Sequence, residues 1–199
     1  MKRITAILLT AVLLLTLASC GGSGMSEDEI RHIYRDLIEA SYVLNDVYYG
    51  DGLPYAEDPE TMASLAGTSS RFSYMPVDKS APYQSEAEIR EATEAVFTKT
   101  MCDHLFTLAF EGMSTDSEET VTFARYIEQN EILTVRIDLA EEALPLGRVY
   151  DFDSMDILSE DKNRIVAVFA TEMDGETSVN VKITLTKTEN GWRLDSPTY

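Results

Sequence analysis

The sequence predicts an α+β domain in which N-terminal helices pack on one curved antiparallel sheet of five or six strands. Two capping boxes of the form Ser-x-x-Glu, at Ser26 and Ser85, indicate where helices begin. From about Thr120 onward, apolar residues alternate with polar ones, which is the period of half-buried strands. Helical periodicity therefore comes first along the chain, and strand periodicity comes second.

The first helix is expected at residues 26–49. Glu29 completes the capping box of Ser26, and apolar side chains recur every three or four residues, which is typical of one buried stripe. Gly50-Asp51-Gly52 is expected to end this helix, because glycine favours the backbone geometry of a helix C-terminus.

The elements between this helix and the strands are less regular. Asp58-Pro59 and Gly67 favour a two-turn helix at 59–66, and residues 72–77 could form a short strand limited by Pro76. The second capping box opens a helix that runs to about Phe97. Thr98 or Thr100 is expected to cap another helix that ends at 111–112, although the two helices could also be one broken helix.

The strands are predicted from alternation and turns. Residues 133–139 and 179–186 alternate strictly, and the continuous apolar run at 165–170 is typical of a central strand. Hairpin turns are expected at the following pairs: Gln129-Asn130, Asp174-Gly175 and Asn190-Gly191.

The N-terminus has the features of a secretory leader. Lys2 and Arg3 precede an apolar run at 4–18, which as a helix would extend roughly 22 Å and so falls short of the ~30 Å hydrocarbon core. The run ends in Leu17-Ala18-Ser19-Cys20, which resembles the lipobox of bacterial lipoproteins. The resemblance implies cleavage before Cys20 and attachment of a diacylglyceryl group to its thiol. An ordinary signal peptide that happens to end in cysteine is the alternative.

These features predict three parts of the chain: a lipoprotein signal peptide at 1–19, a flexible tether at 20–25 and a single α+β domain at 26–199. The expected location is the extracytoplasmic face of the cell membrane, held by the acylated Cys20. Only Cys102 would then remain as a thiol, so no intrachain disulfide is expected.

Charge excludes one large class of partners. The chain has 16 basic and 35 acidic side chains, a formal net charge of −19, and loss of a leader containing Lys2 and Arg3 would make it more negative still. Sequence-independent binding to DNA or RNA needs clustered Lys and Arg to neutralise phosphates. No nucleic-acid partner is therefore expected.

The histidines and the second cysteine are the first candidates for catalysis. His104 is predicted to face solvent, because it shares a polar helical stripe with Asp103, Thr107 and Glu111, and Cys102 is predicted to face the core. Residues two apart on a helix lie on different faces, so the two cannot form a Cys–His dyad. His32 falls on a polar helical stripe. The sequence therefore predicts no catalytic residue and no cofactor, and it lacks the ligand spacing of a closed zinc site.

The acidic run Asp151, Asp153 and Asp156 is the next candidate. A helix-loop-helix calcium site would need an acid or amide where Met155 stands and a glycine where Asp156 stands. The alternation instead indicates a strand edge with outward-facing acids. No metal site is predicted.

Arg125 is unusual because strand alternation places it on the same side as Phe123 and Ile127. One interpretation is a bulge or a strand end that returns its side chain to water. The other is a cation that faces a cavity and binds an anionic ligand.

Aromatic side chains gather around the irregular segment between the first two long helices. Long irregular segments are often binding loops, and tyrosine gives large contact area at low entropic cost. The candidate partner-binding residues are Tyr48, Tyr49, Tyr55, Phe72, Tyr74 and Tyr83. The alternative is that these rings cover one end of the core.

Two wider resemblances follow from the order of elements. A long helix, a helix pair and a bent antiparallel sheet together resemble the cone-like SnoaL-like (nuclear transport factor two-like) fold, which hosts isomerases, dehydratases and non-catalytic binding domains. The stretch from Ser85 to Val96-Phe97-Thr98 and the terminal segment 187–199 resemble secreted inhibitors of cell-wall DL-endopeptidases. No functional residue is transferred from either family.

The sequence therefore favours a non-enzymatic module that binds an envelope protein or peptide, with a cell-wall hydrolase as one candidate partner. Its acidic surface would steer a basic partner toward it. The alternative is an isomerase- or dehydratase-type enzyme, or a small-molecule carrier, that uses the interior of a cone. A spacer or assembly component without a ligand is a third possibility.

Overall fold

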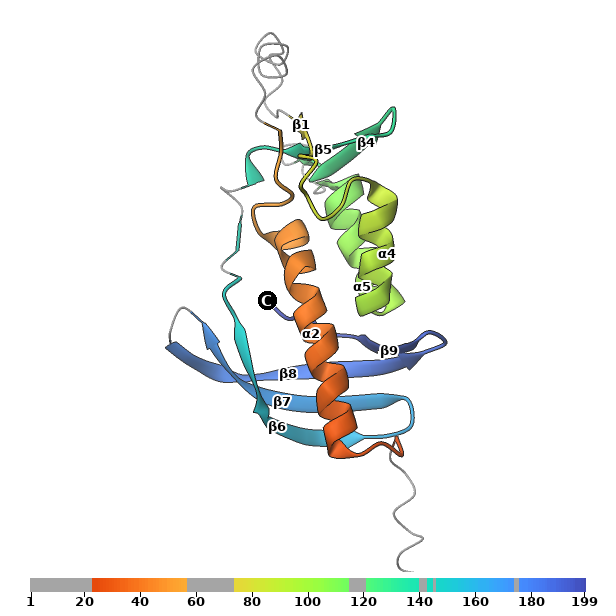
Figure 1. Cartoon of the computed structure of the whole chain (residues 1–199), viewed down its shortest axis with the longest axis vertical. Helices are drawn as coiled ribbons and strands as arrows, with labels where there is room; N and C mark the ends of the chain where they lie inside the picture. The colour runs from red at the N-terminus through yellow and green to blue at the C-terminus, as the bar shows by residue number, and fades with distance from the viewer. Residues whose placement is uncertain (1–22, 57–73, 115–120, 140–142, 145, 174–175) are drawn as a thin grey trace, which may run out of the picture.

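The computed structural model describes residues 23–56, 74–114, 121–139, 143–144, 146–173 and 176–199 (Figure 1). Its helices are α2 (Glu27–Tyr49), α4 (Glu86–Val96) and α5 (Lys99–Phe106), and a π-helical turn, Thr107–Glu111, extends α5. Its strands are β1 (Tyr74–Pro76), β2 (Met113–Ser114), β3 (Val121–Thr122), β4 (Tyr126–Gln129), β5 (Ile132–Arg136), β6 (Val149–Glu160), β7 (Arg164–Met173), β8 (Glu176–Thr188) and β9 (Gly191–Leu194). The predicted α+β class is confirmed.

The prediction of one sheet of five or six strands is wrong. In the described part of the chain, β6-β7-β8-β9 form a four-stranded antiparallel sheet, β1-β5-β4 form a three-stranded one, and β2 pairs with β3. Strand β5 ends at Arg136, and the chain then leaves this sheet to start β6 in the other (Figure 1). Alternation predicts which way side chains face, but it does not say which sheet a strand joins.

Helix α2 packs across the four-stranded sheet (Figure 1). Its inner face consists of Ile30, Tyr34 and Ile38, all fully buried, and Tyr34 meets Phe169 of β7 edge to face at 5.1 Å. The Tyr34 hydroxyl lies 3.1 Å from the carbonyl oxygen of Ile165 and 3.2 Å from that of Ile183. The predicted buried stripe is therefore the contact between the helix layer and the sheet.

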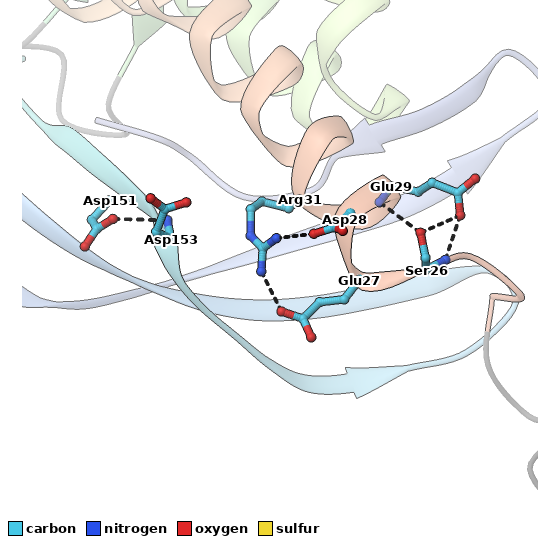
Figure 2. Close-up of polar contacts among 7 residues, drawn as sticks. All are labelled: Ser26, Glu27, Asp28, Glu29, Arg31, Asp151 and Asp153. Carbon is cyan, nitrogen blue, oxygen red and sulfur yellow. Dashed lines mark hydrogen bonds and ion pairs between the residues drawn. The ribbon is translucent and has the colours of Figure 1, made fainter.

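The start of α2 is fixed by the predicted capping box (Figure 2). The Ser26 hydroxyl accepts from the Glu29 amide at 3.3 Å, and the Glu29 carboxylate accepts from the Ser26 amide at 2.7 Å. Arg31 adds two ion pairs of 2.6 Å, one to Glu27 and one to Asp28. The first turn is thus bonded locally, and the pKa of Glu29 is lowered by its hydrogen bonds from Ser26.

The end of α2 is confirmed at Gly50-Asp51-Gly52. Gly52 has a φ of +80°, a conformation that favours glycine, and a Cβ added there would lie 2.7 Å from Cδ1 of Leu139. The next amide, that of Leu53, donates to the Tyr126 hydroxyl at 3.0 Å. This tight turn brings the end of α2 against the three-stranded sheet.

The remaining element predictions have mixed outcomes. Helices α4 and α5 are separate, and Thr98, not Thr100, is the N-cap of α5. The 165–170 run is the core of the central strand β7, and the 190–191 turn joins β8 to β9. The other hairpin turn lies at 130–131, one residue later than predicted. The predicted helix at 59–66 and the turn at 174–175 lie outside the described residues.

The last residues of the chain dock on α2. Thr198 is buried, and its hydroxyl lies 2.6 Å from that of Ser41 and 3.0 Å from Nδ2 of Asn45. The Tyr150 hydroxyl donates to the Thr198 carbonyl oxygen at 3.0 Å. Thr198 therefore joins α2 and β6 through one buried polar cluster.

Replacing Thr198 with valine is expected to lower the free energy of unfolding by about 1–3 kcal/mol, because valine has nearly the same shape but leaves the groups of Ser41 and Asn45 without this partner. Urea denaturation of the folded domain measures the change. The control is Thr186→Val, since the Thr186 hydroxyl has only a long contact of 3.5 Å to the exposed Asp195. Equal losses in both variants would contradict a special role for Thr198.

Candidate functional site

A shallow groove lies along one side of α4, with a volume of about 450 Å³. Its walls are the two loop residues before the helix and four helical residues. We call it the α4 groove, and it is lined by Pro82, Tyr83, Glu88, Glu91, Ala92 and Ala95.

The groove follows from the side-chain pattern of α4. The inner face of the helix, Ile89, Thr93 and Val96, is buried. Beside this face, Ala92 lies four residues beyond Glu88 and Ala95 lies four residues beyond Glu91, so the four side chains share one side of the helix. Two methyl side chains leave a hollow there, and two carboxylates border it.

The loop before α4 holds Tyr83 in place through local hydrogen bonds. The Asp78 carboxylate accepts from the Ser80 amide at 2.8 Å and from its hydroxyl at 2.6 Å, and these bonds lower its pKa. Nε2 of Gln84 donates to the Asp78 carbonyl oxygen at 2.9 Å, and the Gln84 amide donates to the Glu88 carboxylate at 2.6 Å. Half-burial raises the pKa of the Tyr83 hydroxyl. One wall of the groove is therefore already ordered.

The second capping box is only half formed. The Ser85 hydroxyl accepts from the Glu88 amide at 3.2 Å, as predicted, but the Glu88 carboxylate bonds to Gln84 rather than to the Ser85 amide. Glu128 of β4 caps the same helix end, because its carboxylate accepts from the Glu86 amide at 2.6 Å.

The structure does not gather the predicted aromatic residues into one surface. Tyr48 is 1% exposed, and its hydroxyl lies 2.7 Å from that of Thr93, so it is a core residue and cannot meet a partner in this conformation. Tyr49 contacts Tyr199, with ring centroids 4.2 Å apart and ring planes tilted by 39°.

The other aromatic candidates occupy separate places. Tyr55 forms an isolated bridge with Val77, and the Tyr74 hydroxyl donates to the Ala124 carbonyl oxygen at 2.6 Å. Phe72 lies outside the described residues. Of the predicted residues that the structure describes, Tyr83 is the one that lines the α4 groove.

Arg125 is buried, at 5% exposure, so the interpretation that returns it to water is wrong. It lies in a bend between β3 and β4, where the alternation breaks and Phe123 turns outward. Its Nη2 donates to the Gly50 carbonyl oxygen at 2.5 Å, and its Nε donates to that of Val47 at 3.3 Å. Arg125 therefore binds carbonyl groups at the C-terminus of α2. Its binding of an anionic ligand stays a prediction.

A second pocket, of about 380 Å³, lies between α5 and the β8–β9 hairpin. Cys102 contributes to its wall, but the thiol is 2% exposed and burial raises its pKa to about 11. The thiolate is therefore scarce at neutral pH. Lys99 and Asp103 on the rim form an ion pair of 2.8 Å with each other.

The predicted positions of the remaining catalytic candidates are confirmed. His32 and His104 are exposed, and His32 lies 3.4 Å from Asp36. Neither histidine lines either of the two pockets described above.

The acids of β6 also lie where alternation predicts them. Asp151, Asp153 and Asp156 are exposed on an edge strand of the four-stranded sheet. The Asp151 carboxylate accepts from the Asp153 amide at 3.0 Å, as Figure 2 shows. In the part of the chain that the structure describes, no group of three or more potential metal ligands is arranged to hold an ion.

The α4 groove includes five lining residues that were not predicted as site residues from the sequence: Pro82, Glu88, Glu91, Ala92 and Ala95. Four of them lie on α4. Their common signal is the spacing of two alanines and two glutamates on one helical face. That signal is weak on its own, because alanine and glutamate are also common in helices for their propensity alone.

No protein-family model matches the chain, and a search of curated proteins finds no match. None of the described helices has the length and apolar character needed to span a bilayer.

Proposed function

We propose that this chain is a membrane-anchored, extracytoplasmic lipoprotein and that its folded domain is a non-enzymatic binding module. Its partner would be a protein or peptide that inserts a basic and partly apolar segment into the α4 groove. The observation that carries the proposal is the α4 groove itself. Tyr83, in the ordered loop before α4, forms one wall, and the carboxylates of Glu88 and Glu91 on α4 border the hollow.

Charge supports this choice of partner. Glu88 and Glu91 are exposed at the groove, and the chain carries a net charge of −19, so a cationic segment would be attracted from a distance and an acidic one repelled. The aliphatic stem of a Lys or Arg could cover the methyl groups of Ala92 and Ala95 while its charged end meets a carboxylate.

Preorganisation supports the same choice. The hydrogen bonds of Asp78 and Gln84 order the Tyr83 loop before any partner arrives, so binding loses less conformational entropy. A cell-wall hydrolase as the partner, and a cone-like shape of the single domain, are finer predictions within this proposal.

The small-molecule alternative has less support. That alternative uses the interior of a cone-shaped fold, and both histidines are exposed rather than interior. In the pocket beside Cys102, the thiol is protonated at neutral pH and no histidine lines the wall. The small-molecule alternative stays a prediction.

Selection from a library of random 12-residue peptides tests the groove. Peptides that bind the domain are expected to be enriched in Lys or Arg next to an apolar residue. The substitution Ala95→Arg fills the hollow and adds a positive charge, so it is expected to weaken binding of the selected peptides at least about tenfold, or about 1.4 kcal/mol.

The matched control is Ala87→Arg, which makes the same change at an exposed position of the same helix that does not line the groove. It should leave binding unchanged. Enrichment of acidic peptides, or equal loss of binding in both variants, would show that the α4 groove is not the binding surface.

A further inference from the structure

The first described residues are attached to the four-stranded sheet. The Glu160 carboxylate accepts from the Ser23 amide at 2.7 Å and from the Ser23 hydroxyl at 2.5 Å. Met25 packs against the core two residues later. The last three residues of the predicted tether at 20–25 therefore contact the folded domain, and the flexibility of the tether stays a prediction.

This attachment places the predicted anchor at one end of the molecule. Three residues, Cys20 to Gly22, precede Ser23, and they can extend only about 10 Å at ~3.4 Å each. Glu160 is the last residue of β6, and the turn that follows carries Lys162, which is exposed. The Asp161 carboxylate accepts from the amides of Asn163 and Arg164 at 2.7 and 2.8 Å, so the turn is firmly shaped.

The groove lies toward the other end of α2. The helix has 23 residues and so extends about 34 Å along its axis. Just beyond its C-terminus, the Pro54 carbonyl oxygen accepts from the Asp78 amide at 2.8 Å. The Asp78 carbonyl oxygen accepts in turn from Nε2 of Gln84, in the loop that holds Tyr83. Figure 1 shows the two ends of α2 at opposite ends of the molecule, one at the four-stranded sheet and the other near β1 and β5.

We infer that the β6–β7 hairpin faces the lipid headgroups of the bilayer that holds the acyl chains of Cys20, and that α2 leads away from the membrane. The Tyr83 end of the α4 groove is then held about 30 Å further out. The inference rests on the proposed function, because it needs the lipid anchor, and it adds the orientation in which the groove meets a partner. The short span between Cys20 and Ser23 is what restricts the domain to this orientation.

Fluorescence energy transfer to the membrane tests this orientation. The acylated full-length protein is reconstituted into phosphatidylcholine vesicles that contain a headgroup-labelled rhodamine lipid. A maleimide dye is attached in two matched variants, Lys162→Cys at the hairpin and Lys79→Cys near the far end of α2, both at exposed lysines. The parent protein corrects for any labelling of the buried Cys102.

Transfer measured against acceptor density gives the distance of closest approach for each dye. We expect the dye at 79 to lie about 30 Å further from the acceptor plane than the dye at 162. Equal distances, or the reverse order, in an acylated and vesicle-bound protein would overturn this inference and leave the proposed anchor intact. A chain without acyl groups would overturn both.

Variants of Glu160 test the contact itself. In the Lys162→Cys background, Glu160→Ala removes both hydrogen bonds from Ser23. The released segment lengthens the tether, so the distance of closest approach between the dye at 162 and the acceptor plane is expected to increase. Glu160→Gln keeps an acceptor oxygen and should leave that distance unchanged. The same distance in both variants would overturn the role assigned to the Ser23–Glu160 contact.

Discussion

Replacing Cys20 with alanine is expected to move essentially all of the protein from the membrane fraction to the soluble extracytoplasmic fraction. Each buried methylene of an acyl chain contributes about 0.8 kcal/mol to membrane binding, so a diacylglyceryl group holds a protein firmly whereas an unmodified thiol does not. The described helices offer no substitute, since none can span a bilayer. Cell fractionation measures the shift, and mass spectrometry of the N-terminal peptide shows the acyl mass directly.

The chain provides its own control for this experiment. Cys102→Ala removes the other thiol, which is buried 3.6 Å from the Phe97 carbonyl oxygen and not available for acylation, so this variant should stay in the membrane fraction. If Cys20→Ala protein stays there with its leader at 1–19 removed, as mass spectrometry of the N-terminal peptide shows, another part of the chain or a partner holds it at the membrane, and the lipoprotein proposal fails.

The local structure was largely predictable from the sequence, because capping and periodicity are local signals. The capping box of Ser26, the buried stripe of α2 and the central strand β7 lie where the pattern places them. Each of these features depends on residues a few positions apart, and a run of ten or more residues repeats the same signal several times.

Long-range pairing was not predictable in this way. The division into two sheets depends on where the chain goes after Arg136, and no residue pattern at 137–148 encodes that direction. The docking of Ser23 on Glu160 and of Thr198 on Ser41 joins residues more than a hundred positions apart. Such contacts form only once the helix and sheet layers have met.

The candidate site shows the same limit. Tyr83 was identified because aromatic residues in an irregular segment are candidates for binding, but Tyr48 met the same criterion and is a core residue. Exposure separates the two, and exposure depends on the packing of α4 against α2. Composition could identify the segment but not which of its rings faces solvent.

The largest stability effect is expected at Arg125, where methionine should lower the free energy of unfolding by about 2–4 kcal/mol. Helix α2 has no basic residue in its last turn, and the guanidinium of Arg125 donates to the carbonyl groups of Val47 and Gly50, the first of which also accepts from the Tyr126 hydroxyl at 3.0 Å. Methionine keeps most of the aliphatic volume of arginine. The loss of folding free energy would therefore come from buried carbonyl groups that no longer accept from the guanidinium, rather than from a cavity. Urea denaturation of the folded domain measures it.

Arg193→Met is the matched control, because Arg193 also donates to backbone carbonyl groups, those of Glu94 and Trp192, at 2.8 and 2.9 Å. Its side chain is only partly buried, so water can replace the lost bonds and the expected cost is about 1 kcal/mol or less. A loss at Arg125 no larger than the loss at Arg193 would mean that the end of α2 does not depend on this guanidinium. The link between the helix and the three-stranded sheet would then have to come from Gly52 and the Tyr126 hydroxyl instead.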